Sequence, residues 1–420
     1  MLTNNMNDMI TNMDTKLQPL KGFRDFLPEE AQKRQWLEDQ MVKVFEKWGY
    51  EPLESPTVES LELFEGEIGE DEKLFFKFED PGGRKVALRY DQTVPSCRVV
   101  GQYADEITFP FRRYQIQSTF RAEKPQKGRY REFTQADIDI YGIKSPIADA
   151  ECIAVSIDLY KSLGFKQPVA IINNRDLLAG IPYPAIAAID QLKKIGKDGV
   201  IEVMQKKGIS KKMALEYLNK VENLKPDEKI KIIFDYLKNA GLDESYYRFE
   251  PTLCRSLSYS EGPIWEMTIS GYSTNTFAGS VGGGERYDGM FKRITGKDIP
   301  ATGIAFGFDR TLEALEELNL LPNFDSVTKI LVTVFSANLF DKSLEIANQL
   351  RQNSINTEVY LIPETKLDKQ LKYADQKNIP YAIILGPDEI QSNQVTLKDL
   401  KSRTQKTIPS DELVKELSML

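Results

Sequence analysis

The apolar residues of this chain recur with two periods, one typical of helices and one of strands. In residues 29–48, apolar side chains such as Trp36, Met41 and Phe45 recur at helical spacing, and Gly49 follows. The pattern therefore predicts a helix over 29–48. Elsewhere, short apolar or alternating runs predict strands at 50–59, 108–120, 132–142, 263–269 and 276–281, and a helical pattern covers 148–163.

Turn-forming residues divide these elements. The turn DPGGR predicts a hairpin within residues 73–100, with a helix that starts near Thr93. The loop EKPQKGR separates the strands 108–120 and 132–142. After the strand at 276–281, the pattern predicts a glycine-rich turn and then a helix after Gly303.

Two stretches differ from the rest of the chain. Residues from about 180 to 248 are rich in lysine and poor in strand signals, which predicts an inserted helical module. After a linker predicted at 322–328, apolar runs alternate with helical patterns, which is typical of a sheet with helices on its faces. We therefore predict an α+β fold with a flexible segment at 1–18, a main domain at 19–325 and an α/β domain at 328–420.

Composition excludes several classes of site. The chain contains no histidine, which rules out Ser-His-Asp systems, His-ligated zinc and histidine phosphorelay. Its three cysteines lie far apart without a CxxC pair, so we expect neither disulfides nor protein-ligated zinc. Neither a secretory signal nor an apolar run long enough to span a membrane is visible, and we expect a cytoplasmic protein. A net charge of −8 argues against indiscriminate nucleic-acid binding.

Two segments place arginines where they could hold phosphate. In STFRAEKPQKGRYREF at 118–133, Arg121 leaves one strand and Arg129 enters the next, with Phe133 nearby. A guanidinium fork matches phosphate oxygens, and an aromatic face can carry a purine ring. In PATGIAFGFDRTLEAL at 300–315, small residues lead into a helix with Arg310 in its first turns. Taken alone, the first segment is more commonly a charged hairpin with solvated arginines, and the second is a weak signal that also fits a strand-to-helix connection with a surface arginine.

Together the two segments resemble motifs 2 and 3 of class II aminoacyl-tRNA synthetases. The helix at 29–48 and the strand that ends at Pro56 resemble motif 1, the dimer-forming element. The similarity is closest to the histidyl-tRNA synthetase family and covers residues 19–420. It is carried by the segments KGFRDFLPEE, LRYDQTVPSCR, GRYREFTQADIDIYG, INNRDLL, LCRSLSYSEGPIWE and GGGERYDGM.

The resemblance implies a fold and a reaction. It implies a class II catalytic domain, with an antiparallel sheet flanked by helices and a helical insertion, and a C-terminal anticodon-binding domain. The implied reaction joins L-histidine to ATP as an adenylate and then transfers histidine to the 3′ end of histidine tRNA. Mg²⁺ would accompany ATP, no metal would be held by the protein alone, and the protein would be a homodimer without a membrane partner.

The resemblance also assigns residues. Arg121 and Arg255 would be catalytic, and Lys124, Gln126 and Lys127 would contact tRNA. ATP would be bound by Arg121, Glu123, Arg129, Phe133 and Arg310. Histidine would be bound by Asp91, Gln92, Thr93, Arg121, Gln135, Asp139, Arg255, Tyr259, Ser260 and Tyr287.

The sequence departs from the family pattern at one place and leaves alternatives open. Ser258 and Ser260 stand where the family commonly has an aspartate and a tyrosine, so a nearby aromatic residue, Trp265, Tyr272 or Tyr287, is expected to fill the pocket. The alternatives are an inactive regulatory subunit of histidine biosynthesis that shares this fold, a class II synthetase of another specificity, and a structural RNA-binding protein.

Overall fold

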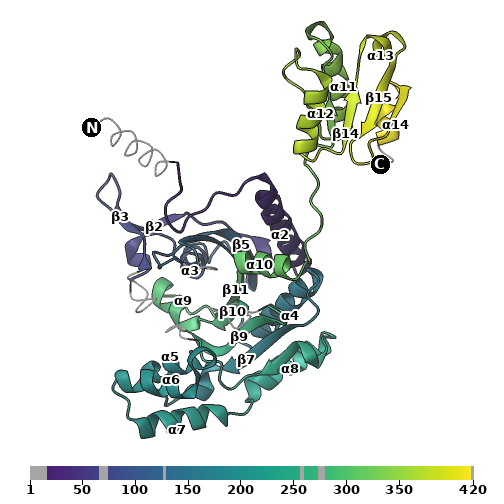
Figure 1. Cartoon of the computed structure of the whole chain (residues 1–420). Helices are drawn as coiled ribbons and strands as arrows, with labels where there is room; N and C mark the ends of the chain where they lie inside the picture. The colour runs from purple at the N-terminus through teal and green to yellow at the C-terminus, as the bar shows by residue number, and fades with distance from the viewer. Residues whose placement is uncertain (1–16, 66–73, 126–128, 256–259, 273–279, 418–420) are drawn as a thin grey trace, which may run out of the picture. The chain divides into compact units, whose positions relative to one another are not determined.

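The chain folds into two compact units, Met1–Leu321 and Pro322–Leu420. The computed structural model describes residues 17–65, 74–125, 129–255, 260–272 and 280–417 (Figure 1). The predicted flexible segment therefore lies almost entirely outside the described residues, as do Gln126, Lys127 and Tyr259. In the described part of the chain, no helix is long and apolar enough to cross a membrane.

An eight-stranded sheet forms the centre of the first unit. Its strands β1 and β5 pair in parallel, as do β7 and β8, and the other neighbours pair antiparallel. In spatial order the strands are β1 (Glu51–Pro52), β5 (Phe111–Phe120), β6 (Glu132–Tyr141), β11 (Ala301–Gly307), β10 (Ser280–Arg286), β9 (Glu261–Ile269), β7 (Pro168–Asn174) and β8 (Tyr247–Phe249). This architecture confirms the predicted α+β fold class.

Helices cover one face of this sheet. The predicted first helix is α2 (Pro28–Lys47), and with α4 (Ile147–Ser162), α8 (Glu228–Asn239) and α10 (Phe308–Glu317) it contributes to one large apolar core. Strand β6 shows why, since Ala136, Ile138 and Ile140 belong to this core while the residues between them, such as Asp137 and Asp139, are polar. The alternation leaves the opposite face of the sheet available for polar groups.

A second apolar cluster links two helices of the first unit to a small sheet. It joins α3 (Thr93–Gln102) and α9 (Asp288–Thr295) to a small sheet, whose strands are β2 (Val58–Ser60), β4 (Lys85–Leu88) and β3 (Lys77–Glu79), and to the turn η1 (Leu61–Leu63). The predicted hairpin corresponds to β3 and β4, which pair antiparallel. Helix α3 begins at Thr93, where the sequence predicted it.

The helical insertion has its own apolar core. The turn η3 (Arg175–Leu178) leads into α5 (Tyr183–Ile189), α6 (Leu192–Lys206) and α7 (Lys211–Glu222), which are neighbours in Figure 1. Their apolar residues pack together. Helix α6 is kinked at Gly196, whose φ is +67°. Helix α8 instead packs in the main core, and η4 (Glu244–Tyr246) returns the chain to the sheet at β8.

Two glycine-rich segments are strands rather than the predicted turn and helix start. Gly282, Gly283 and Gly284 lie inside β10, and residues 301–307 form β11, so that the helix begins only at Phe308. In β11 small residues alternate with Thr302, Ile304 and Phe306, which is the period of a strand. Glycines ordinarily weaken strands, and this led to the incorrect prediction.

The second unit is a mixed sheet with helices, as the alternating pattern predicted. Its strands follow the order β13 (Thr357–Val359), β12 (Ile330–Val332), β14 (Tyr381–Ile384), β15 (Gln394–Asp399) and β16 (Gln405–Pro409). Its helical segments are η5 (Ala337–Leu339), α11 (Phe340–Gln352), α12 (Leu367–Gln376), α13 (Pro387–Gln391) and α14 (Leu413–Leu417). The three parallel strands were predicted, whereas the antiparallel pair β15 and β16 was not.

Candidate active site

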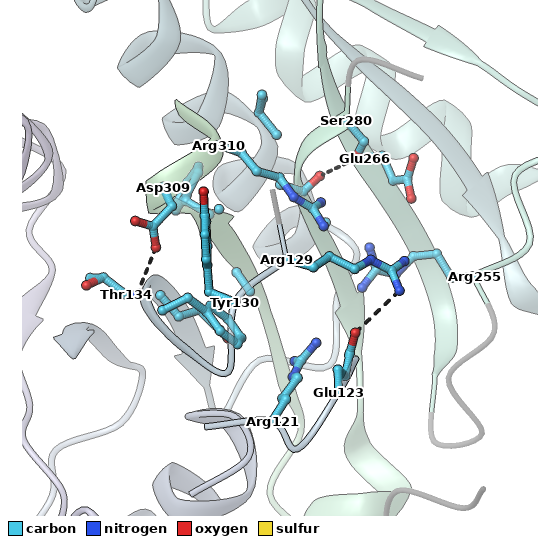
Figure 2. A pocket seen from close by; sticks show the side chains of 18 residues that line it. Arg121, Glu123, Arg129, Tyr130, Thr134, Arg255, Glu266, Ser280, Asp309 and Arg310 are labelled. Atoms are coloured by element: carbon cyan, nitrogen blue, oxygen red, sulfur yellow. Dashed lines mark hydrogen bonds and ion pairs between the residues drawn. The ribbon is translucent and has the colours of Figure 1, made fainter. Parts of the chain in front are cut away.

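Four arginines from three segments of the chain line one cavity of about 290 Å³ in the first unit. Arg121 follows β5, Arg129 precedes β6, Arg255 precedes β9, and Arg310 lies in the first turn of α10. Figure 2 shows these side chains around the same space. The convergence that the sequence resemblance implied is therefore present in the structure.

The small residues of β10 and β11 make room for this cavity. Gly282, Gly283, Ala305 and Gly307 are among its lining residues. At Gly283, an added Cβ would stand 1.6 Å from Nη1 of Arg255, which is far inside van der Waals contact. The glycine-rich run of β10 therefore leaves the space in which the guanidinium group of Arg255 lies.

Arg121 is held against two aromatic rings. Its guanidinium carbon lies 4.3 Å from the ring centre of Tyr90 and 5.1 Å from that of Phe133, and its Nε donates to the carbonyl of Tyr90 at 3.3 Å. Arg129 pairs with Glu123, with Nη1 and Oε2 3.3 Å apart. The aromatic contacts restrict Arg121, while the remaining N–H groups of its fork are donors suited to an anion.

Arg255 is oriented by Glu285. Its Nε donates to Oε2 of Glu285 at 2.8 Å, and Ser260 Oγ donates to the same oxygen at 2.9 Å. The backbone of Arg255 has a φ of +45°, an unusual conformation for a residue with a side chain. Glu285 and Ser260 thus fix a strained residue whose side chain reaches the cavity.

The charges in the cavity favour an anionic ligand. Burial lowers the pKa of Arg310, and the nearby cations Arg129 and Arg121 lower it further. Burial also raises the pKa of Glu266, another lining residue, an effect that Arg255 partly opposes. Because like charges gathered in a half-closed site repel one another, a bound polyanion such as a triphosphate would relieve this repulsion.

A layer of buried polar residues adjoins the arginine cavity. Asp91 accepts a hydrogen bond from the backbone N–H of Val94 at 3.1 Å, and burial raises its pKa to about 6, against the opposing effect of Arg121. Asp139 accepts a bond from the Tyr287 hydroxyl at 2.5 Å. Gln92 donates to the carbonyls of Gln117 and Gln135, and among the described side chains its buried Oε1 is one of the few polar atoms without a hydrogen-bond partner.

Most of the candidate residues fall in these two connected places. The cavity is lined by Arg121, Glu123, Arg129, Phe133, Gln135, Arg255 and Arg310. The buried polar layer contains Asp91, Gln92, Asp139, Ser260 and Tyr287. Thr93 is half-buried at the start of α3, and Lys124 is exposed beyond β5. Tyr259, Gln126 and Lys127 are not placed, because they lie outside the described residues.

The expected aromatic replacements for Ser260 are only partly available. Trp265 and Tyr272 belong to the large core with α2, α4 and α10, and neither lines the cavity. Tyr287 does contact Asp139 in the polar layer. The expectation that Trp265 or Tyr272 would fill the pocket is therefore wrong, because both belong to the core beneath the sheet.

Several site residues were missed in the sequence. Asp309 lines the cavity and accepts bonds from Arg34 at 2.6 Å, from Arg24 at 2.8 Å and from the backbone N–H of Thr134 at 3.1 Å. Its position beside Arg310 was the only local signal. Glu285 and Glu266 were missed as well, although Glu285 lies within the GGGERYDGM segment.

The donor set does not form a metal cage. In the described ranges, no group of three or more histidine, cysteine, aspartate or glutamate side chains could hold a metal ion. Three carboxylates line the cavity, Glu123, Glu266 and Asp309, and Asp309 is already paired with Arg24 and Arg34. This set fits an ion such as Mg²⁺ that is held chiefly by phosphate oxygens and water, with one or two protein carboxylates.

Comparisons with known sequences give one consistent family. A sequence model described as histidyl-tRNA synthetase matches residues 22–213, and one described as an anticodon-binding domain matches residues 329–420. The histidine–tRNA ligase of Cytophaga hutchinsonii is 35% identical, over 94% of this chain and 98% of that protein. The histidine–tRNA ligase of Wolinella succinogenes is also 35% identical, over 95% of this chain and 97% of that protein.

Solved structures agree with the sequence comparisons. The crystal structure of histidyl-tRNA synthetase from Nostoc sp. PCC 7120 superposes with a TM-score of 0.80 at 26% identity, and covers 96% of this chain and 99% of that one. A structure described as an ATP phosphoribosyltransferase regulatory subunit/histidyl-tRNA synthetase from Bacillus halodurans matches with a TM-score of 0.69 at 23% identity, covers 88% of this chain and 99% of that one, and shows only the shared fold.

Proposed function

The chain belongs to the histidyl-tRNA synthetase family, and we propose that it activates L-histidine with ATP and transfers it to histidine tRNA. The observation that carries the proposal is the convergence of Arg121, Arg129, Arg255 and Arg310 on one cavity. Such a cluster can hold an α-phosphate and a pyrophosphate at once, which a histidine-activating enzyme needs.

The arginines divide the phosphate groups between them. Arg121, held by Tyr90 and Phe133, binds the α-phosphate and the histidine carboxylate from one side. Arg255 neutralises the α-phosphate from the other side, since Glu285 fixes its orientation. Arg129 and Arg310 hold the β- and γ-phosphates, Glu123 orients Arg129, and Phe133 carries the adenine ring. Positioning and charge neutralisation of this kind account for most of the catalysis in phosphoryl and adenylyl transfer.

The buried polar layer receives the amino acid. Asp91 and Asp139 accept hydrogen bonds from the α-ammonium and ring N–H groups of histidine, and Gln135 and Tyr287 border the same space. The remaining contacts are those of Gln92, Thr93, Tyr259 and Ser260. No step requires an imidazole from the protein, because a phosphate oxygen of the adenylate can accept the proton of the tRNA hydroxyl.

Several partners belong to the same proposal. Glu123 or Glu266 would help to hold a Mg²⁺ ion that accompanies ATP, and this ion would supply charge neutralisation on the phosphates. Histidine tRNA meets the loop of Lys124, Gln126 and Lys127 with its acceptor end and residues 329–420 with its anticodon. We also propose a homodimer, formed through α2 and its neighbouring strand, that acts in the cytoplasm.

The alternatives have less support. An inactive regulatory subunit would share the fold, but the match of residues 329–420 to an anticodon-binding domain and the four clustered arginines favour a ligase. A ligase of another specificity is disfavoured because the curated relatives at about 35% identity are histidine–tRNA ligases over almost their full length.

Amino-acid-dependent ATP–pyrophosphate exchange, measured with each of the twenty amino acids in turn, tests the proposal. We expect exchange with histidine alone, because its α-ammonium and its ring N–H can pair with the two buried aspartates, whereas an amino acid without a side-chain N–H would leave one aspartate unpaired. Exchange with proline or threonine instead would indicate another specificity. The absence of exchange with any amino acid would favour the regulatory alternative.

The charge of Asp91 predicts a pH dependence. Burial raises the pKa of Asp91 to about 6, so the carboxylate is ionised above this pH and protonated below it. If Asp91 binds the α-ammonium, kcat/KM for histidine falls as the pH is lowered from 7 to 5 (about tenfold per pH unit below 6). The measurement is the ratio of wild type to Asp91→Asn, in which the titration of free histidine cancels. We expect this ratio to fall about tenfold between pH 7 and pH 5, and a ratio that is constant with pH would contradict the role.

A further inference from the structure

A fully buried arginine lies beneath the histidine pocket, in a position that the proposed mechanism has not used. Arg113 of β5 is 0% exposed, and its Nη2 lies 2.5 Å from Oδ2 of Asp139. The two residues are direct cross-strand partners in the β5–β6 ladder. Opposite charges facing each other across an antiparallel pair hold both side chains in register.

The other contacts of Arg113 keep it in place. Its Nη2 also donates to Ser96 Oγ at 3.0 Å, and its Nη1 donates to Gln115 Oε1 at 3.2 Å. Ser96 in turn shares a hydrogen bond of 2.6 Å with the Tyr141 hydroxyl. Arg113 is therefore fixed by β5, α3 and β6 together, and it has little freedom to leave Asp139.

Asp139 is held from both of its oxygens. Arg113 forms an ion pair with Oδ2 that lacks hydrogen-bond geometry, and the Tyr287 hydroxyl donates to Oδ1 at 2.5 Å. At Gly303, the partner of Asp139 on β11, an added Cβ would stand 1.9 Å from Oδ1, so that a glycine is needed for the carboxylate to lie where it does. Among the described side chains, Oδ2 has no hydrogen-bond partner and Oδ1 can accept a second hydrogen bond, so both oxygens can still accept N–H groups of a ligand.

We propose that Arg113 is a positioning residue for histidine activation, which orients Asp139 and keeps it charged so that its remaining lone pairs accept N–H groups of the amino acid. The inference rests on the proposed function and deepens it. A buried carboxylate without a paired cation takes up a proton, and it would then offer a donor where the ligand also offers a donor.

The surroundings of Asp139 make this cation necessary. Burial raises the pKa of Asp139, and Arg113 and the Tyr287 hydroxyl oppose that rise. Most other titratable groups nearby are acids or weak acids that disfavour a second negative charge. The titratable groups that interact electrostatically with Asp139 are Arg113 from β5, Asp137 and Tyr141 from β6, Glu285 from β10, Tyr287 at the start of α9, Cys97 from α3 and Cys152 from α4.

The test compares Arg113→Gln with Arg113→Lys in histidine-dependent ATP–pyrophosphate exchange between pH 6.5 and 8.5. For Arg113→Gln we expect the KM for histidine to rise about tenfold at pH 7, while the KM for ATP stays within about twofold. The ratio of variant to wild-type KM for histidine should fall as the pH rises, because a higher pH removes the proton that Asp139 then carries. Arg113→Lys should remain within about threefold of wild type at every pH, since lysine restores the charge.

Asp139→Asn supplies the coupling control. In that background, Arg113→Gln should change the KM for histidine by less than about twofold, because the charge on which Arg113 acts is already gone. A full additional loss would mean that Arg113 acts through another group and would overturn the proposal. Gln115→Met, which removes a contact of Arg113 but leaves Asp139 paired, should keep the wild-type pH profile.

The outcomes separate the inference from the proposed function. If the wild type shows no exchange with histidine, the proposed function fails. If the wild type is active and folded Arg113→Gln has an unchanged KM for histidine, or equal, pH-independent losses for both substrates, the positioning role is wrong. Thermal melting shows whether Arg113→Gln folds. If Arg113→Gln does not fold, Arg113→Lys provides the test. Lysine keeps the positive charge, so the ratio of its KM for histidine to that of wild type should not depend on pH. A pH-dependent ratio in a folded lysine variant would contradict the proposal.

Discussion

Replacing Arg255 with alanine is expected to lower histidine-dependent ATP–pyrophosphate exchange by about 10³-fold, with little change in the melting temperature. Arg255 lines the cavity and is held at 2.8 Å from Glu285, so its fork is ready before the substrates bind. In the transition state, negative charge grows around the α-phosphate, and Arg255 is the proposed counter-charge opposite Arg121. Its loss should therefore appear in kcat more than in the KM for histidine. Single-turnover adenylate formation measures this step directly.

Arg112→Ala is the matched control for this experiment. Arg112 forms a two-bond ion pair with Glu151, at 2.6 and 3.0 Å, and does not line the cavity. Its loss also removes an arginine–glutamate pair from the same unit, and we expect exchange activity within about twofold of wild type. Near-normal adenylate formation by Arg255→Ala, or a comparable loss in both variants, would contradict the role assigned to Arg255.

Gly283→Ala is expected to abolish most of the activity without unfolding the protein. The added Cβ would stand 1.6 Å from Nη1 of Arg255, and its nearest neighbours are all atoms of this one flexible side chain. The backbone can therefore keep its course while the guanidinium group is displaced from the cavity. We expect exchange activity to fall about 10²-fold and the melting temperature to stay within about 4 °C of wild type.

The control for this substitution is Gly199→Ala in helix α6. There the added Cβ would also meet a side chain, with Ile195 Cβ at 2.8 Å, but the residue lies in the insertion and not in the cavity. We expect normal exchange activity for Gly199→Ala. If Gly283→Ala keeps full activity, Arg255 can act from a displaced position, and the space beside Gly283 is not needed for activity. If its melting temperature falls by much more than that of the control, the loss is one of folding.

The sequence predicts the local parts of this molecule well. Helix α2 has apolar residues at helical spacing, α4 is an apolar helix that is buried on most sides, and β5 and β6 are long strands joined by one loop. Adjacent antiparallel strands bring Arg121 and Arg129 together across that loop, so this half of the cavity follows from local pattern alone. Local pattern did not predict the glycine-rich strands β10 and β11. Their small residues leave room for the cavity, but such residues do not favour strands.

The sequence alone does not predict that distant segments converge on the cavity. Arg255 and Arg310 reach the cavity because β9, β10 and β11 pair in a particular order and register, and no local pattern in one sequence fixes that order. Only the resemblance to a family placed these residues near Arg121. The pairing of Arg113 with Asp139 was missed for the same reason, since both look like polar residues of unrelated strands until the register is known.

The central claim is that one nucleotide lies between Arg121 and Arg255 with its pyrophosphate against Arg129 and Arg310. A crystal structure of the protein with histidine, ATP and Mg²⁺ tests this most directly. We predict guanidinium nitrogens of both Arg121 and Arg255 within about 3 Å of α-phosphate oxygens, with the histidine ammonium against Asp91 or Asp139. A nucleotide bound away from this cavity, or an α-phosphate that contacts neither arginine, would contradict the account.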